Sequence, residues 1–99
     1  MLEIQTEQNG VEYTVYLSGR LDTNTSPDLE ATLRELFDGM DELIFDLEKL
    51  DYISSAGLRV LLSAQKVMND RGGMVVRNVN DDVMDVFEMT GFIDFLSIL

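Results

Sequence analysis

The residues best placed to do chemistry in this chain are two adjacent serines, Ser54 and Ser55, which precede an apolar run. A serine directly before an apolar helical pattern is typical of a helix N-cap. A hydroxyl at such a place lies beside unpaired backbone N–H groups and the positive end of the helix dipole, and both favour a phosphate group. The pattern therefore predicts either simple helix capping or a phosphorylatable switch, with Ser55 as the switch residue.

The composition argues against catalytic uses of these serines. The chain has no His and no Cys, which removes imidazole acid–base chemistry, thiol nucleophiles and the usual zinc sites. A nucleophilic serine needs a base, and neither Lys49 nor Lys66 has a spacing that indicates activation. Asp22, Asp46 and Asp51 allow a magnesium-dependent phosphoacceptor aspartate, but the acidic pair such a site needs is missing, which favours solvated carboxylates. We expect no enzyme, no metal site and no cofactor.

Length and charge limit the domain count and the partners. With 99 residues, the chain is expected to form one domain over residues 1–99. Its net charge of -12 argues against nucleic acid and anionic membranes, and it suits a basic or mixed-charge protein partner. Polar side chains at positions 3, 5 and 7 interrupt any early apolar run, and no stretch is long enough to span a bilayer. The expected location is therefore cytoplasmic.

The first third of the chain has the pattern of a hairpin. Residues 2–8 and residues 11–18 each alternate apolar and polar side chains, which predicts two strands. Asn9-Gly10 between them is a strong signal for a tight turn, so the two strands should pair antiparallel. We expect Gly19 to end the second strand and residues 21–24 to form a polar connection.

Strand and helix patterns then alternate. Thr25 or Ser26 is the expected cap of a first helix that ends near Gly39. Residues 43–47 are a short apolar run, which predicts a strand that is covered on both faces and parallel to the second strand. Residues 48–51 should form a polar link from this strand to the serine pair.

The second helix is predicted over residues 55–69. Its polar side chains fall on a single line along the helix, formed by Arg59, Ser63, Lys66 and Asp70. Continuing that line back by one turn reaches Ser55, so this serine should lie at the N-terminal end of the solvent-exposed face of the helix. The other side chains are apolar or small, and they predict a helix that is mostly buried, with Leu62 in the core.

The remaining elements complete an α/β domain. A short strand is predicted at residues 74–76, a third helix from a cap at Asn80 through an inner stripe that includes Thr90, and a last strand at residues 95–99. Right-handed crossovers between strands imply a mixed, mostly parallel sheet with about three helices. In such sheets the loops after the strands share one edge, here the loops at residues 22–24, 51–55 and 78–80.

Two residues beside the serines have two interpretations each. Gly57 costs a helix about 1 kcal/mol relative to alanine, which is explained either by close packing or by room for a docking partner. Arg59 lies four residues after Ser55 on the same predicted face, so it is either an ordinary exposed arginine or a hydrogen-bond donor to a phosphate.

Five segments, in this order and at these spacings, resemble the STAS domain of bacterial anti-sigma-factor antagonists of the sporulation and stress-response type. The segments are Leu-Ser-Gly-Arg-Leu-Asp at 17–22, Ile-Phe-Asp-Leu at 44–47, Ser-Ser-Ala-Gly-Leu at 54–58, Gly-Gly-Met-Val-Val at 72–76 and Val-Phe-Glu-Met-Thr-Gly at 86–91. The resemblance covers nearly the whole chain. It implies a STAS-like fold for the single domain.

The resemblance also implies a partner-switching cycle. The unphosphorylated domain would bind an anti-sigma factor that is also a serine kinase, which frees the sigma factor. The kinase would use its own ATP to phosphorylate the domain and end the binding, and a PP2C-type phosphatase would reverse the step. Aligning the family motif Asp-Ser-Ser/Thr-Gly-Leu on Gly57 places the acceptor at Ser55, with Ser54 as the alternative. The expected partner contacts are Asp22, Thr23, Asn24, Ser54, Ser55, Ala56, Gly57 and Arg59.

This chain departs from the family pattern in three respects. Ser54 stands where the family has Asp, and Ala56 stands where it has Ser or Thr. Many members carry a further helix beyond the last strand, so a less covered sheet and a monomer or weak homodimer are expected here. Two other functions remain open: a STAS subunit of a lipid-transport ABC system, which needs no phosphorylation, and an acyl carrier protein, against which the strand patterns argue. A receiver-like phosphoacceptor domain is more distant.

Overall fold

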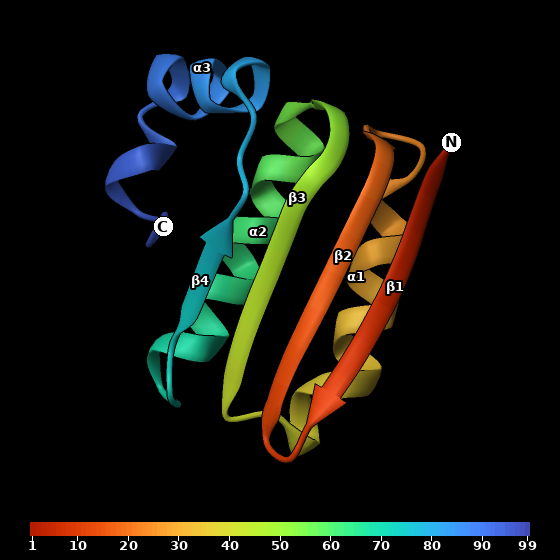
Figure 1. Ribbon diagram of the computed structural model, residues 1–99, viewed down its shortest axis with the longest axis vertical. Coiled ribbons are helices and arrows are strands. Elements are labelled where there is room, and N and C mark those ends of the chain that lie inside the picture. Colours follow the sequence, from red (N-terminus) through yellow and green to blue (C-terminus); the bar gives the residue numbers. More distant parts are fainter.

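A four-stranded sheet forms one layer of the molecule in the computed structural model, which describes residues 1–99 (Figure 1). The strands are β1 (Leu2–Asn9), β2 (Glu12–Leu21), β3 (Glu42–Ile53) and β4 (Met74–Arg77), and they lie side by side in that order. β1 and β2 form the predicted antiparallel hairpin, and the β2–β3 and β3–β4 pairs are parallel. The mixed, mostly parallel sheet is thus confirmed.

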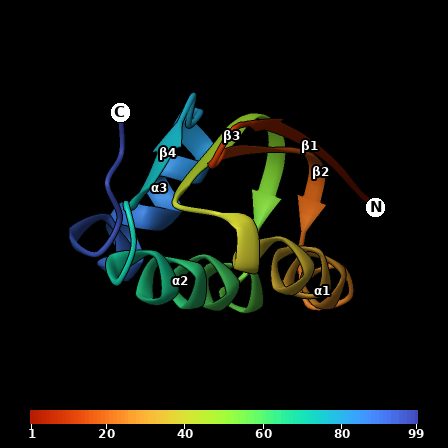
Figure 2. The same cartoon turned by 90° about the horizontal axis from the view of Figure 1, so that it is seen from below.

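Three α-helices complete the domain, as the sequence predicted. They are α1 (Ser26–Leu36), α2 (Ser55–Asn69) and α3 (Asp81–Thr90), with 3₁₀ turns η1 (Phe37–Gly39) and η2 (Phe92–Asp94). α1 and α2 lie next to each other under one face of the sheet (Figure 2). None of the helices is both long enough and apolar enough to cross a membrane.

The core lies between the sheet and the helices. Alternate side chains of β2 and β3 point into it and are almost completely buried, among them Val15, Leu17, Phe45 and Leu47. The predicted boundaries of α2 are confirmed, but the side of the helix that faces the core differs slightly from the prediction. Leu58 and Leu61 are buried, whereas Leu62 is only half-buried, so its assignment to the core is wrong. Thr90, expected on the inner side of α3, is exposed.

The two central strands are longer than predicted. β2 continues past Gly19 to Leu21, and β3 continues through the expected link at residues 48–51 to Ile53. The parallel register between them shifts at two points, one of them beside Gly19, whose φ is +99°. A side chain at Gly19 would clash with the carbonyl oxygen of Met1, so this glycine permits an irregularity in the strand and does not end it.

The outer face of the sheet has no helix layer, so the expectation of a β3 strand covered on both faces is wrong (Figure 2). Asp46 lies on this face, yet only 8% of its side chain is exposed, because polar neighbours cover it. It accepts hydrogen bonds from Arg77 Nε at 3.1 Å, Asn78 Nδ2 at 2.9 Å and the backbone N–H of Glu48 at 3.1 Å. Burial alone raises the pKa of Asp46, but these bonds outweigh it and lower that pKa below its usual value.

The expected last strand at residues 95–99 is reduced to an isolated parallel bridge between Val76 and Ile98. The backbone N–H of Leu99 donates to the carbonyl of Val76, so the segment does lie along the edge of β4. Only three residues separate the end of η2 from Ile98, so the extended segment that could pair with β4 is very short.

Candidate functional site

Three loops meet at the edge where the parallel strands end, at the top of Figure 1. Hydrogen bonds hold this edge together. The backbone N–H of Ser54 donates to the carbonyl of Leu21 at 2.9 Å, and the side-chain amide of Asn80 donates to the carbonyl of Leu50 at 2.6 Å. Asn80 also caps α3 by accepting from the backbone N–H of Val83, as predicted. The grouping of the three loops at one edge is therefore confirmed.

The two serines differ in what they contact. Ser54 has extended backbone angles and is the N-cap of α2; its Oγ accepts a hydrogen bond from the backbone N–H of Gly57 at 3.4 Å. Ser55 is the first residue of α2, it is exposed, and its hydroxyl makes no hydrogen bond within the chain. Capping thus accounts for Ser54 and leaves the hydroxyl of Ser55 available for modification.

Gly57 lies inside the molecule. A Cβ added there would lie 2.7 Å from Leu21 Cγ and 3.0 Å from Ile53 Cγ1, distances that are too short for carbon atoms. The first turn of α2 therefore packs directly against the ends of β2 and β3. This contact favours the packing interpretation of Gly57, which is buried beneath the surface.

Asp22 organises the loop between β2 and α1. Its Oδ1 accepts hydrogen bonds from the backbone N–H groups of Asn24 and Thr25, both at 3.0 Å. The bond from the Thr25 backbone is the main reason that the pKa of Asp22 lies below its usual value. Thr25 is the N-cap of α1, but its side chain does not cap the helix. The exposed side chains of Thr23 and Asn24 are thus presented by a turn that Asp22 holds in place.

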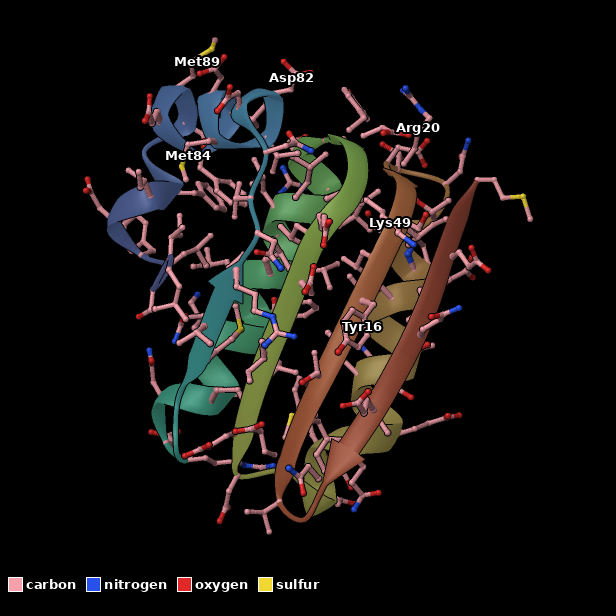
Figure 3. The ribbon with its side chains drawn as sticks, viewed as in Figure 1. Tyr16, Arg20, Lys49, Asp82, Met84 and Met89 are labelled. Carbon is pink, nitrogen blue, oxygen red and sulfur yellow. The ribbon has the colours of Figure 1, made fainter.

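An arginine that the sequence analysis did not single out lies at this edge. The guanidinium of Arg20 stacks over the ring of Tyr52, 4.2 Å from its centroid, and its Nε lies 3.8 Å from Asp22 Oδ2. Figure 3 shows Arg20 at the end of β2. The cross-strand pair of Arg20 and Tyr52 depends on the late part of β3, which the sequence pattern showed as a loop. If β3 is extended to include Tyr52, the cross-strand position of Tyr52 opposite Arg20 is the sequence signal that predicts this contact.

Arg59 and Ala56 lie beside the serines on α2. Arg59 is exposed and forms no ion pair. Together with Thr23 from the first loop, these two residues line a hollow of about 240 Å³ between α1 and α2. The structure therefore brings seven of the eight expected contact residues to one surface edge, with only Gly57 buried beneath it.

The side chains at this edge are suited to polar contacts with another molecule. Across residues 1–99, no three carboxylate, His or Cys side chains group closely enough to hold a metal ion. The edge presents an exposed hydroxyl at a helix N-terminus, where free backbone N–H groups and the helix dipole favour an added phosphate. It also presents two arginines, Arg20 and Arg59, that can bind polar groups of a partner.

Comparisons with known proteins agree with this description. The STAS domain family model matches residues 3–98. The chain is 38% identical over 84 residues to BtrV of Bordetella bronchiseptica, named as an anti-sigma factor antagonist, covering 83% of this chain and 72% of that protein. It is 30% identical over 99 residues to an anti-sigma-B factor antagonist of Staphylococcus aureus, covering 98% of this chain and 92% of that protein.

Solved structures show the same fold. An anti-sigma factor antagonist from Mycobacterium paratuberculosis superposes with a TM-score of 0.89 at 21% identity, covering 99% of this chain and 85% of that one. The Bacillus cell fate determinant SpoIIAA in its phosphorylated form superposes with a TM-score of 0.77 at 18% identity, covering 98% and 91%.

Proposed function

This chain belongs to the STAS domain family, and from that membership we propose that it is an anti-sigma factor antagonist whose binding is switched off by a phosphate on Ser55. The names of the Bordetella and Staphylococcus relatives support the antagonist role. The chain then acts by binding an anti-sigma factor, and the released sigma factor is the output.

The observation that carries the choice of Ser55 is its free, exposed hydroxyl at the start of α2. Its neighbour Ser54 already uses its hydroxyl to cap the helix. A phosphate on Ser55 adds about -1.5 to -2 charges at neutral pH. The nearby N–H groups of the helix terminus can donate hydrogen bonds to the phosphate, so the fold tolerates the added charge. A bound partner, in contrast, loses contacts because of the steric bulk and the charge repulsion of the phosphate.

The rest of the cycle requires other proteins. The anti-sigma factor is expected to be the serine kinase and to supply the ATP site, and a PP2C-type phosphatase is expected to remove the phosphate. This chain needs no cofactor for its part, which is to present Ser55 to the kinase and the loop edge to the partner.

Two substitutions at Ser55 test the proposal. Ser55→Ala should remove phosphorylation by the kinase and ATP, because the acceptor oxygen is gone, and should keep binding to the anti-sigma factor. Ser55→Asp should weaken binding by about tenfold or more, equivalent to about 1.4 kcal/mol, with little change in the melting curve. Phosphosite mapping by mass spectrometry measures the first outcome, and titration calorimetry of each unphosphorylated variant with the anti-sigma factor measures the second.

Ser54→Ala is the matched control, because it removes a hydroxyl one residue away. This variant should lose some stability but should still accept a phosphate, and its binding should fall less than that of Ser55→Asp. A phosphate mapped to Ser54 in the wild-type chain, or a Ser55→Asp protein that binds as tightly as wild type, would contradict the assignment. Capture of a transport ATPase subunit in place of an anti-sigma factor would instead support the alternative STAS role in lipid transport.

A further inference from the structure

Two hollows between α1 and α2 join into one groove on the helical face of the molecule. The hollow nearer the serines has a volume of about 240 Å³ and the second about 330 Å³. They share Glu30, Val60 and Ser63, so they form a continuous depression that begins at Ala56 and ends at Val67. Figure 2 shows α1 and α2 side by side under the sheet.

The floor of the groove is apolar. Leu33, Val60 and Ala64 lie at its base and are buried, and Phe37 and Val67 close its far end and are half-buried. Ser63 lies in the middle, where both hollows meet, and is exposed. An apolar floor with a small exposed residue at its centre leaves space for the side chains of another helix.

The rim of the groove differs in charge from the rest of the chain. The whole chain has 19 acidic and 7 basic residues, yet Glu30 is the only acid among the lining residues, and it already pairs with Arg34. Arg59 lines the groove on the α2 side and forms no ion pair. The rim therefore carries unpaired positive charge.

We propose that this groove binds an amphipathic helix of the protein partner, with an apolar stripe facing the floor and acidic side chains facing Arg59. From residue 56 to residue 67, α2 rises by about 17 Å, which matches about three turns of a docked helix. The basic rim selects for acidic side chains in the occupant, since charge complementarity across an interface favours the correct partner and opposes others.

The proposal rests on the proposed function where it concerns the switch. One end of the groove lies at Ala56, directly after Ser55 in α2. A phosphate on Ser55 would stand at the mouth of the groove and repel the acidic residues of the docked helix. The groove thus supplies a reason why one added phosphate weakens binding along the whole interface.

A synthetic 14-residue helical peptide with leucines along one face and glutamates along the other is a suitable probe. Titrated into the isotopically labelled full chain, it should shift the backbone amide NMR signals of α1 and α2 around Ser63, and the shifts should shrink at high salt. A counterpart peptide with lysine in place of glutamate should shift the signals around Ser63 less. Equal shifts with the lysine peptide, or no shifts with the glutamate peptide, would overturn the proposal.

Ser63→Trp fills the groove, and it should weaken binding of the glutamate peptide by about tenfold or more. The matched control is Ala31→Trp, which adds the same bulk at an exposed position of α1 outside the groove. Arg59→Glu provides a second variant that does not add bulk, and it should also weaken binding. Unchanged affinity in both groove variants, or an equal loss with Ala31→Trp, contradicts the inference.

Sedimentation of the chain without peptide tests the other occupant, a second copy. Self-association that Ser63→Trp abolishes would assign the groove to a dimer and overturn the proposal of a partner helix; a monomer at the concentrations used for NMR supports it. Because the peptide experiment uses no anti-sigma factor, its failure is distinguishable from failure of the proposed function, which the Ser55 variants test.

Discussion

Ser54 and Ser55 are both serines, but their hydroxyl groups have different roles because Ser54 is the N-cap of α2 and Ser55 is its first residue. Ser54 lies outside the helix with extended backbone angles, so its Oγ can turn back to the N–H of Gly57. Ser55 lies inside the first turn, where it is exposed and its hydroxyl makes no hydrogen bond within the chain. The sequence pattern predicted a cap and a switch within this pair, and only the helix boundary decides which serine has which place.

At the same scale, Asp46 gives the molecule a defined response to acid. Its pKa is lowered in the folded state, so its charged form stabilises the fold at pH values above the unfolded pKa of about 3.9. That contribution is lost as the pH falls through the lower, folded pKa. We expect Asp46→Asn to be less stable than wild type at pH 7 and the difference to shrink toward pH 2.

Urea unfolding of both proteins between pH 7 and pH 2 measures this difference. Asp85→Asn is the matched control, since Asp85 is exposed on α3 and forms no ion pair. A stability gap between wild type and Asp46→Asn that stays constant over this pH range would show that the carboxylate charge is not the cause.

At the scale of elements, the phase of α2 determines which leucines hold the helix to the sheet. Leu61 is completely buried, whereas Leu62 is half-buried outside the core. Leu61→Ala should therefore lower the free energy of unfolding by about 2–5 kcal/mol. Leu62→Ala should cost less than half of the Leu61→Ala loss, because part of its side chain is already in water. Denaturant melts of the two variants compare them, and equal losses would mean that the helix is rotated relative to this description.

Local patterns predicted most of the elements, and tertiary pairing explains the misses. The boundaries of α2 and the cap of α3 follow from serine, asparagine and glycine at fixed places, so the sequence alone was sufficient. The extra length of β3 was not predictable, since Glu48, Lys49 and Asp51 look like a loop until β2 is placed beside them. Leu50 and Ile53, buried on the same face as Leu47, are the apolar signal that the charged residues obscured.

The candidate site was predictable as a set of loops but not as a surface. Parallel topology placed Asp22 and Ser55 at one edge, and the structure agrees. The sequence pattern could not show that Gly57 is buried, because its burial depends on how closely α2 approaches Leu21 and Ile53. Nor could it show Arg20 stacked on Tyr52, because that contact requires the cross-strand register.

At the scale of the whole molecule, the excess of acidic residues acts on stability through self-repulsion. With a net charge of -12 on a chain of 99 residues, folding brings like charges together. Added salt screens such repulsion over distances of about 10 Å at 0.1 M. We expect the melting temperature to rise between 10 mM and 200 mM sodium chloride, measured by calorimetry at pH 7. A melting temperature that falls over this range would mean that favourable ion pairs dominate.

The tight contact of Gly57 with Leu21 and Ile53 also bears on how fast a signal can pass through this domain. The start of α2 packs against the ends of β2 and β3 with no space for a side chain at Gly57, so Ser55 stands on a closely packed part of the fold. A switch of the proposed kind then changes the surface without waiting for an internal rearrangement. The rate at which binding switches on and off would then be set by the turnover of the kinase and phosphatase and by dissociation of the partner. A conformational change within the domain would not limit it.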